Sequence, residues 1–79
     1  MTLSGSEWIG RYAERLGLDM PAVEEAAMLL NLAGIAAHCS ERTAAPISCW
    51  LAARAGISAA EALAIAEKIR DELVVEAER

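Results

Sequence analysis

The feature that most constrains this chain is a long apolar run that ends in a short polar turn. The segment Ala26–Pro46 reads AAMLLNLAGIAAHCSERTAAP. As a helix, its first part would be apolar on nearly every side, and such a helix is buried against neighbours on several sides. We therefore expect a central helix, flanked by other helices or by a second copy of the chain. Gly34 lies within it, and because glycine weakens a helix by about 1 kcal/mol relative to alanine, we expect it to allow a close helix crossing.

Length and composition limit the core that can surround this helix. The 79 residues make a single domain, 1–79, and a chain this short buries only about 60% of the surface that its unfolded form exposes. Hydrophobic residues make up 56% of the sequence, but many are alanine, Phe is absent, and the large aromatics are Trp8, Tyr12 and Trp50. Stability therefore requires good packing or association between chains.

Apolar periodicity and helix-end signals predict four helices. We expect the first to be capped by Ser6 and to stop at Gly17, the second to run from about Asp19 or Pro21 to Cys39 or Ser40, the third to span Pro46 to Ala55, and the fourth to follow Ser58. Residues 1–5 and 76–79 are expected to fray. No strand-like alternation occurs, and the predicted fold is all-α: a compact bundle of four helices joined by short turns.

The charge balance argues against several classes of partner. Twelve acidic and seven basic residues give a net charge of −5, which disfavours binding to nucleic acid or to an anionic membrane surface. The third helix carries only Arg54 as a basic group, which argues against a helix-turn-helix DNA binder. The apolar run is too short to span a bilayer. MTLSGSEW has no leader pattern, so we expect a cytoplasmic protein with reduced thiols.

The polar turn holds the side chains with chemical potential. His38, Cys39 and Cys49 could in principle ligate a metal, but their spacing matches no C-x-x-C or H-x-x-x-H pair. His38 and Cys49 could approach across the turn for thiol catalysis, although nothing in the sequence requires it. We favour cysteines that act as small buried hydrophobes and a histidine that is hydrogen-bonded or faces solvent near a helix C-terminus. We therefore predict no metal, no cofactor and no catalytic residue.

Arg42 and the two tryptophans each allow a binding role beside a structural one. Arg42 precedes a helix N-terminus, where a guanidinium beside free N–H groups suits an anion. We favour the alternative in which Arg42 caps the carbonyls that end the central helix or pairs with Glu41. Trp8 and Trp50 would mark a partner surface if exposed, but tryptophans at helical spacing more often fill the core.

The sequence also resembles a known family. The segment Leu29–Ala33, the Ala37-His38 pair and the run Glu41-Arg42-Thr43-Ala44-Ala45-Pro46-Ile47 resemble a small bacterial helical domain of unknown function. Members of that family occur alone or fused C-terminally to molybdenum cofactor guanylyltransferase. The family pattern often has proline where this chain has Thr43, and it contains no established catalytic set.

The resemblance implies an accessory to molybdenum cofactor (molybdopterin guanine dinucleotide) biosynthesis, without the nucleotidyltransferase part. We therefore expect a non-enzymatic protein-interaction module that contacts a partner such as the guanylyltransferase. The candidate ligand or partner contacts are His38, Glu41, Arg42 and Pro46. Two alternatives stay open: a small-ligand domain that recognises a phosphate of a nucleotide or pterin, and a structural homodimer built on the central helix.

Overall fold

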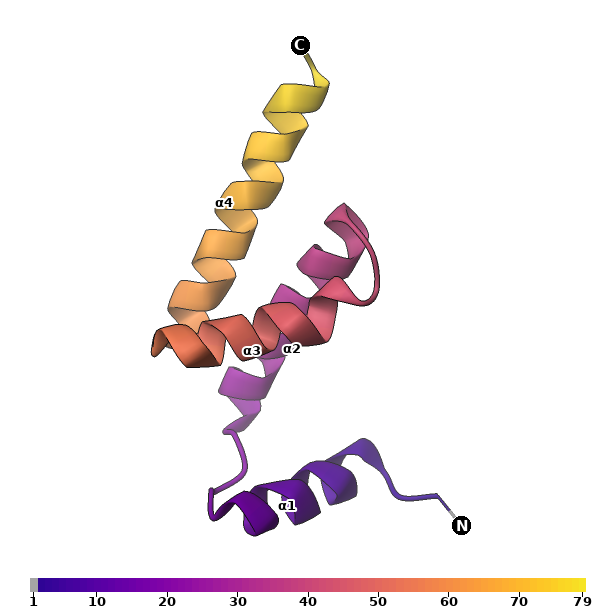
Figure 1. The fold of residues 1–79 in the computed structure, drawn as a ribbon, viewed down its shortest axis with the longest axis vertical. Helices are drawn as coiled ribbons and strands as arrows, with labels where there is room; N and C mark the ends of the chain where they lie inside the picture. Colours follow the sequence, from indigo (N-terminus) through magenta and orange to yellow (C-terminus); the bar gives the residue numbers. More distant parts are fainter. Residues whose placement is uncertain (1) are drawn as a thin grey trace.

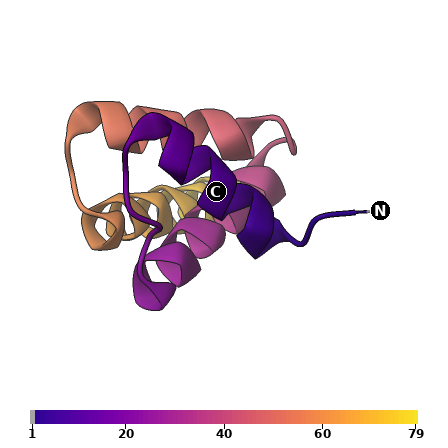
Figure 2. The ribbon, with the colours of Figure 1, turned by 90° about the horizontal axis from the view of Figure 1, so that it is seen from below.

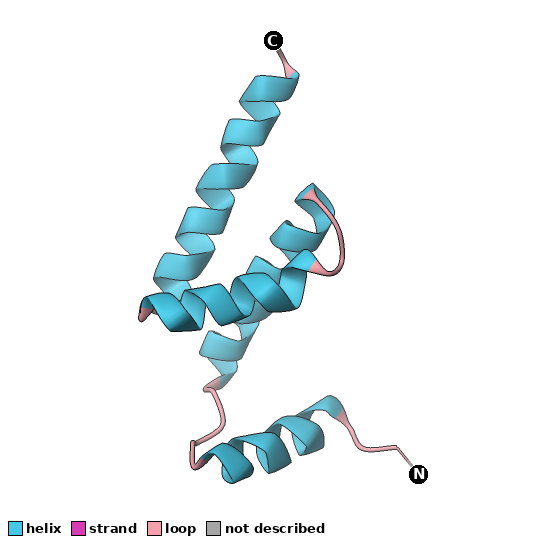
Figure 3. Ribbon diagram, viewed as in Figure 1, coloured by secondary structure: helices cyan, strands magenta, loops and turns pink. Residues whose placement is uncertain are grey.

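The computed structural model describes residues 2–79, and within that range the chain forms four α-helices and no strand. The helices are α1 (Gly5–Leu16), α2 (Val23–Cys39), α3 (Ala44–Ala55) and α4 (Ala59–Ala77), as Figure 3 shows. Connections of three to six residues, counted between these bounds, join them. The predicted all-α fold of four helices joined by short turns is confirmed. None of these helices is long and apolar enough to cross a membrane.

The central element is α2, which packs along both α3 and α4. No other pair of helices shares an extensive interface, so α3 and α4 diverge over α2 (Figure 1). The first helix, α1, lies beyond the N-terminal end of α2 (Figures 1 and 2). The radius of gyration is 14.4 Å, against about 11.6 Å for a compact 79-residue domain by the usual size scaling. The elongation comes from the position of α1 and from the free end of α4.

The start of α1 is held by a reciprocal cap, and the predicted cap at Ser6 is wrong. The N-cap is Ser4, whose hydroxyl accepts a hydrogen bond from the Glu7 N–H at 3.1 Å. In return the Ser4 N–H donates to Glu7 Oε1 at 3.0 Å. This backbone hydrogen bond favours the carboxylate and lowers the pKa of Glu7 below its usual range. The helix ends, as predicted, at Gly17, which adopts the left-handed conformation with φ of 72°.

The next two helix starts differ from the predicted ones. The second helix begins at Val23 after an extended Ala22 that forms no side-chain cap, so the start predicted at Asp19 or Pro21 is wrong. Residues 18–22 stay outside the helix, and Pro21 disfavours helical geometry at the residue before it. The third helix begins at Ala44, two residues before the predicted start, because Pro46 is tolerated within a first turn.

The fourth helix starts as its sequence predicts. Ser58 accepts a hydrogen bond from the Glu61 N–H at 3.1 Å, which is the N-cap that the S-x-x-E spacing indicates. The regular helix then continues to Ala77, through Val74 and Val75. The last turn is exposed on every side, and this end of α4 extends past the end of α2 (Figure 1).

Burial is the main departure from expectation. Among the described residues only Ala13, Leu32 and Ala62 are buried hydrophobics. The predicted core positions of Trp8 and Trp50 are wrong for the single chain, since their exposed fractions are 60% and 59%. The helix α2 is central, as expected, but it is not covered all round. The predicted close crossing at Gly34 is also wrong, because no atom lies within 4 Å of the position a Cβ would take there.

Candidate functional site

The four predicted contact residues lie at the turn between α2 and α3, and all four are exposed. His38 is in the last turn of α2, where a solvent-facing histidine was expected, and Pro46 is in the first turn of α3. The turn is closed by other groups. The Ala44 and Ala45 N–H groups donate to the carbonyls of Glu41 and Arg42 at 3.0 and 3.2 Å. These backbone bonds hold the turn without any of the four predicted side chains.

Arg42 does not fill the structural role expected of it. Within residues 2–79 the one ion pair joins Arg70 Nε to Asp71 Oδ1 at 3.2 Å. Arg42 therefore neither pairs with Glu41 nor caps the carbonyls that end α2. Ser40 occupies the latter role in part, because its hydroxyl donates to the Ala36 carbonyl at 2.7 Å. Arg42 is exposed.

The predicted residues do not converge on one site. A shallow hollow of about 490 Å³ lies beside the turn, and Glu41 is the only predicted residue among those that line it. Two of its other lining residues are Thr43 and Ser48. A carboxylate at the rim of this hollow repels a phosphate, so the geometry does not favour the small-ligand alternative there. His38, Arg42 and Pro46 are not among the lining residues.

The two cysteines are free and differ in burial. Cys39 is exposed, so the expectation that it is a buried hydrophobe is wrong, whereas Cys49 is half-buried on α3. The Cys49 thiol donates a weak hydrogen bond to the Leu29 carbonyl of α2, with a sulfur–oxygen distance of 3.9 Å. This contact explains Cys49 as part of the α2–α3 packing. No group of three metal-ligating side chains comes together in the part of the chain that the structure describes.

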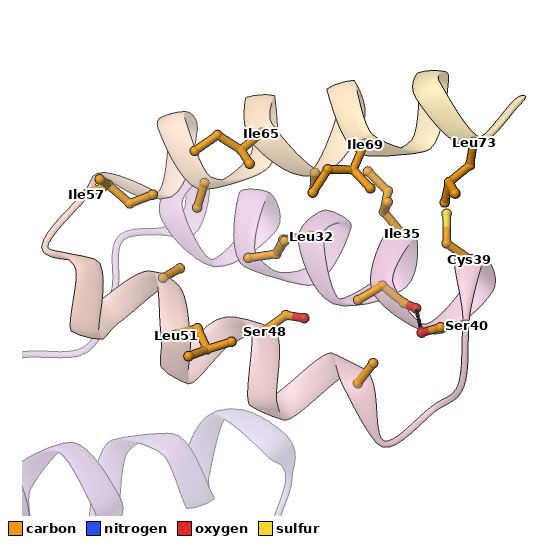
Figure 4. A pocket seen from close by; sticks show the side chains of 15 residues that line it. Leu32, Ile35, Cys39, Ser40, Ser48, Leu51, Ile57, Ile65, Ile69 and Leu73 are labelled. Carbon is orange, nitrogen blue, oxygen red and sulfur yellow. Dashed lines mark hydrogen bonds between the residues drawn. The ribbon is translucent and has the colours of Figure 1, made fainter. Parts of the chain in front are cut away.

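The surface also carries an apolar groove between α3 and α4, which the sequence did not reveal as a groove. It encloses about 450 Å³, and α2 forms its floor (Figure 4). Nearly all of its lining residues are aliphatic, and the polar side chains among them are Cys39, Ser40 and Ser48. The lining residues are Leu32, Ile35, Ala36, Cys39, Ser40, Ala44, Ser48, Leu51, Ala52, Ile57, Ala62, Ile65, Ala66, Ile69 and Leu73.

The groove is open because its two walls do not meet. Leu32 on the floor is buried, but Leu51 of α3 and Ile65 of α4 keep 56% and 53% of their surface exposed. Figure 4 shows these side chains on opposite walls, with Ile69 and Leu73 farther along α4. An apolar, uncharged groove of this kind stabilises a complementary apolar surface by excluding water from both. It offers no buried acid, base or nucleophile pair.

A second apolar surface is carried by α1. Trp8, Tyr12 and Leu16 recur every fourth residue and are all exposed, and Ile9 lies beside them. The rings of Trp8 and Tyr12 stack with their centroids 6.1 Å apart and their planes 9° apart. This spacing is typical of one apolar face of a helix, but no extensive interface with α2, α3 or α4 covers that face.

Trp50 has a local partner instead. The guanidinium of Arg54, one turn on, lies 5.0 Å from the centre of the Trp50 ring, which is within range for a cation–π contact. Since Trp50 is two residues from Ser48, it points about 200° away from the groove around α3. Trp8 and Trp50 therefore belong to different surfaces of the molecule.

Comparison with known proteins identifies a family for the chain. A family described as a domain of unknown function (DUF6457) matches residues 3–79. This match confirms the resemblance to a small family of unknown function, while the fusion to molybdenum cofactor guanylyltransferase stays a prediction. Comparison with curated proteins and with solved structures finds no match.

Proposed function

Because the chain belongs to DUF6457, a family of domains of unknown function, we propose its role from its own surfaces: a non-enzymatic module that works by protein association. A fold alone does not determine a function. The proposal rests on one observation, the amount of apolar surface that the folded chain leaves uncovered. Three helices share a core, and a groove and an amphipathic helix stay without a partner.

The exposed surface is too large for a self-contained domain. The accessible area is 6491 Å², whereas a folded monomer of this 8.4 kDa mass exposes about 4,600 Å² by the usual scaling. The chain thus buries only about 47% of its unfolded surface, against about 60% for small stable domains. The difference, about 1,900 Å² per chain, is the surface that a partner would cover.

The chemistry of this surface suits association. The exposed large hydrophobics include members of all four helices, among them Trp8, Leu30, Leu51 and Ile69. A contiguous apolar surface on a soluble protein marks an interaction site. The titratable side chains, in contrast, are exposed or half-buried, and no polar or charged side chain among residues 2–79 is buried. Catalytic acids and bases are usually found where burial perturbs their pKa values.

An accessory role in molybdenum cofactor biosynthesis is part of the proposal, and the family resemblance supports it. The turn carrying His38, Glu41, Arg42 and Pro46 is exposed and its side chains are unpaired with one another, so it is accessible to a larger partner such as the guanylyltransferase. In such a complex, the turn would contribute polar contacts at the edge of an apolar interface. This matches the usual arrangement of an apolar centre and a polar rim.

The test is light scattering during size-exclusion chromatography, with the chain alone and mixed with a molybdenum cofactor guanylyltransferase. The proposal predicts a mass above 8.4 kDa for the chain alone or co-elution with the enzyme at a fixed stoichiometry. Arg42→Ala should weaken co-elution, and Arg70→Ala on α4 is the matched control. A cooperatively folded monomer that co-elutes with nothing would contradict the association role.

A further inference from the structure

We propose that the groove between α3 and α4 is filled by α1 of a second copy of this chain, so that two copies exchange their first helices. This inference rests on the proposed association function and names the occupant of its surface. Each half of the resulting dimer is a four-helix bundle made of α2, α3 and α4 of one chain and α1 of the other. Such an exchange is a low-cost route to a dimer, because the same residues form the same contacts in each half.

No helix of the same chain covers the groove, and α1 is the helix whose apolar face is left uncovered. Every lining residue lies between Leu32 and Leu73, so α1 contributes nothing to the groove of its own chain. Figure 1 shows α1 beyond the N-terminal end of α2. Four helices around a shared apolar centre are the stable form of this architecture. The fourth position is therefore vacant in the single chain and is completed by an added helix.

The dimensions of helix and groove agree. The lining of the α4 wall runs from Ala62 to Leu73, which is 12 helical residues or about 18 Å at 1.5 Å per residue. The helix α1, Gly5–Leu16, is also 12 residues long and so about 18 Å. Its apolar stripe brings two of the three large aromatics of the chain. The groove is lined by smaller aliphatic side chains, so Trp8 and Tyr12 supply the missing volume.

The linker directs α1 away from its own groove. After Gly17 turns the chain in the left-handed conformation, the Leu18 N–H donates back to the Ala13 carbonyl at 2.9 Å. Farther along, the Met20 sulfur lies 3.4 Å from the position that a Cβ of residue 10 would occupy, so Met20 packs on α1 itself. The linker is thus folded against α1 rather than extended along α2. A second copy can receive α1 without undoing these contacts.

Charge allows the exchange although the chain as a whole is acidic. The net charge is −5, so two copies repel over most of their surfaces. The helix α1 is balanced, with Glu7 and Glu14 against Arg11 and Arg15. The residues that line the groove include no charged side chain. The neutral helix α1 can therefore enter the uncharged groove without electrostatic repulsion. Most of the acidic excess of the chain lies on α4 instead.

The uncovered area is that of a stable homodimer. The excess of about 1,900 Å² per chain corresponds to about 3,800 Å² of total buried surface, computed with the same scaling. Obligate homodimers bury about 2,000 to 5,000 Å² in total, and their interfaces resemble a domain core cut in two. The exposed apolar face of α1 and the open groove are the two halves of such a core.

The experiment uses the two tryptophans as separate reporters in full-length chains. Trp50→Phe leaves only Trp8, which enters the groove in the proposed dimer, and Trp8→Phe leaves only Trp50, which points away from it. Light scattering should give twice the 8.4 kDa chain mass. The emission of Trp8 should be blue-shifted and shielded from acrylamide, while Trp50 should behave as an exposed tryptophan.

Charge placed in the groove provides the perturbation. Ile65→Asp should raise the dimer dissociation constant by about 100-fold or more, because the carboxylate would be buried without a partner. Leu30→Asp is the matched control: Leu30 is 73% exposed and lies two residues from Leu32, about 200° around α2 from the groove. It should leave the dissociation constant within a few-fold of the wild-type value.

The outcomes separate the two proposals. A dimer in which Trp8 is as exposed as Trp50 would overturn the exchange and leave the association function standing. A dimer that Leu30→Asp disrupts and Ile65→Asp spares would assign the interface to the other face of α2, again overturning the exchange. A monomer in which Trp8 is shielded would mean that α1 closes its own groove, and a stable monomer without a partner protein contradicts both proposals.

Discussion

Removing the hydroxyl that caps α1 tests whether this helix belongs to the cooperative core. The variant is Ser4→Ala, and the matched variant is Ser58→Ala at the start of α4. Both serines accept a hydrogen bond at 3.1 Å from the N–H of a glutamate three residues on. Both are exposed, so each substitution removes the N-cap of one helix. Ser58→Ala also removes a longer hydrogen bond from the Ser58 hydroxyl to Glu61 Oε1 at 3.4 Å, which is exposed and weak.

The expected loss of stability follows from the contribution of the N-cap. Replacing an N-cap serine by alanine costs about 1 kcal/mol of helix stability. In an exchanged dimer that unfolds in one step to two chains, each variant removes this amount twice, about 2 kcal/mol per dimer. Because about 1.4 kcal/mol corresponds to a factor of ten, the unfolding constant should rise about 30-fold for both variants.

The assay is urea denaturation followed by far-ultraviolet circular dichroism at several protein concentrations, fitted to a folded dimer and two unfolded chains. Equal destabilisation by Ser4→Ala and Ser58→Ala supports a core that includes α1. If α1 were a free appendage, Ser4→Ala would leave the main transition unchanged while Ser58→Ala shifted it. That result would refute the placement of α1 in the groove.

Three further predictions concern the fold. Leu32→Ala should lower the free energy of unfolding by about 2 to 5 kcal/mol per chain, because Leu32 is buried at the floor of the groove; an unchanged urea midpoint would contradict this. Gly56→Ala should destabilise the fold by about 1 to 2 kcal/mol because φ is 72° there. Gly34→Ala should stabilise it by up to about 1 kcal/mol because space is free around Gly34. Thermal denaturation should therefore show a lower midpoint for the first variant and a higher one for the second. The lowered pKa of Glu7 makes the α1 cap strongest above its ordinary pKa of 4.5, and the contribution is lost as the pH falls through the folded-state value. Glu7→Gln keeps a capping residue without a titrating group, so helix content should lose this part of its pH dependence.

The sequence predicts the helices well because their signals are local. Gly17 and Gly56 follow the helices that they end, and Ser58 with Glu61 shows the spacing of a cap. The same spacing relates Ser4 to Glu7, so the true start of α1 was available from the sequence, although Ser6 was the residue predicted. Helix starts near a proline are harder to predict. A proline can lie within the first turn of a helix or just before the helix, and the local sequence does not distinguish the two positions.

The candidate groove could be predicted only in part, because periodicity shows which face of a helix is apolar but not what covers it. Ile65 and Ile69 are four residues apart and so share one face of α4, yet this spacing fits a closed core and an open groove equally well. Trp8 presents the same ambiguity: its helix is amphipathic, but its position relative to α2 depends on the linker. The predicted contact residues around Arg42 came from a polar turn in an apolar segment and from the family resemblance, and neither shows whether the side chains converge.

The most direct test of the exchanged dimer is an isotope-filtered nuclear Overhauser experiment on a sample that mixes labelled and unlabelled chains, because it detects only contacts between copies. The structure predicts intermolecular signals between the ring protons of Trp8 or Tyr12 and the methyl groups of Ile65 and Ile69. Their appearance would place α1 of one copy in the groove of the other. The absence of these intermolecular signals from a mixed sample shown to be folded would contradict the exchange.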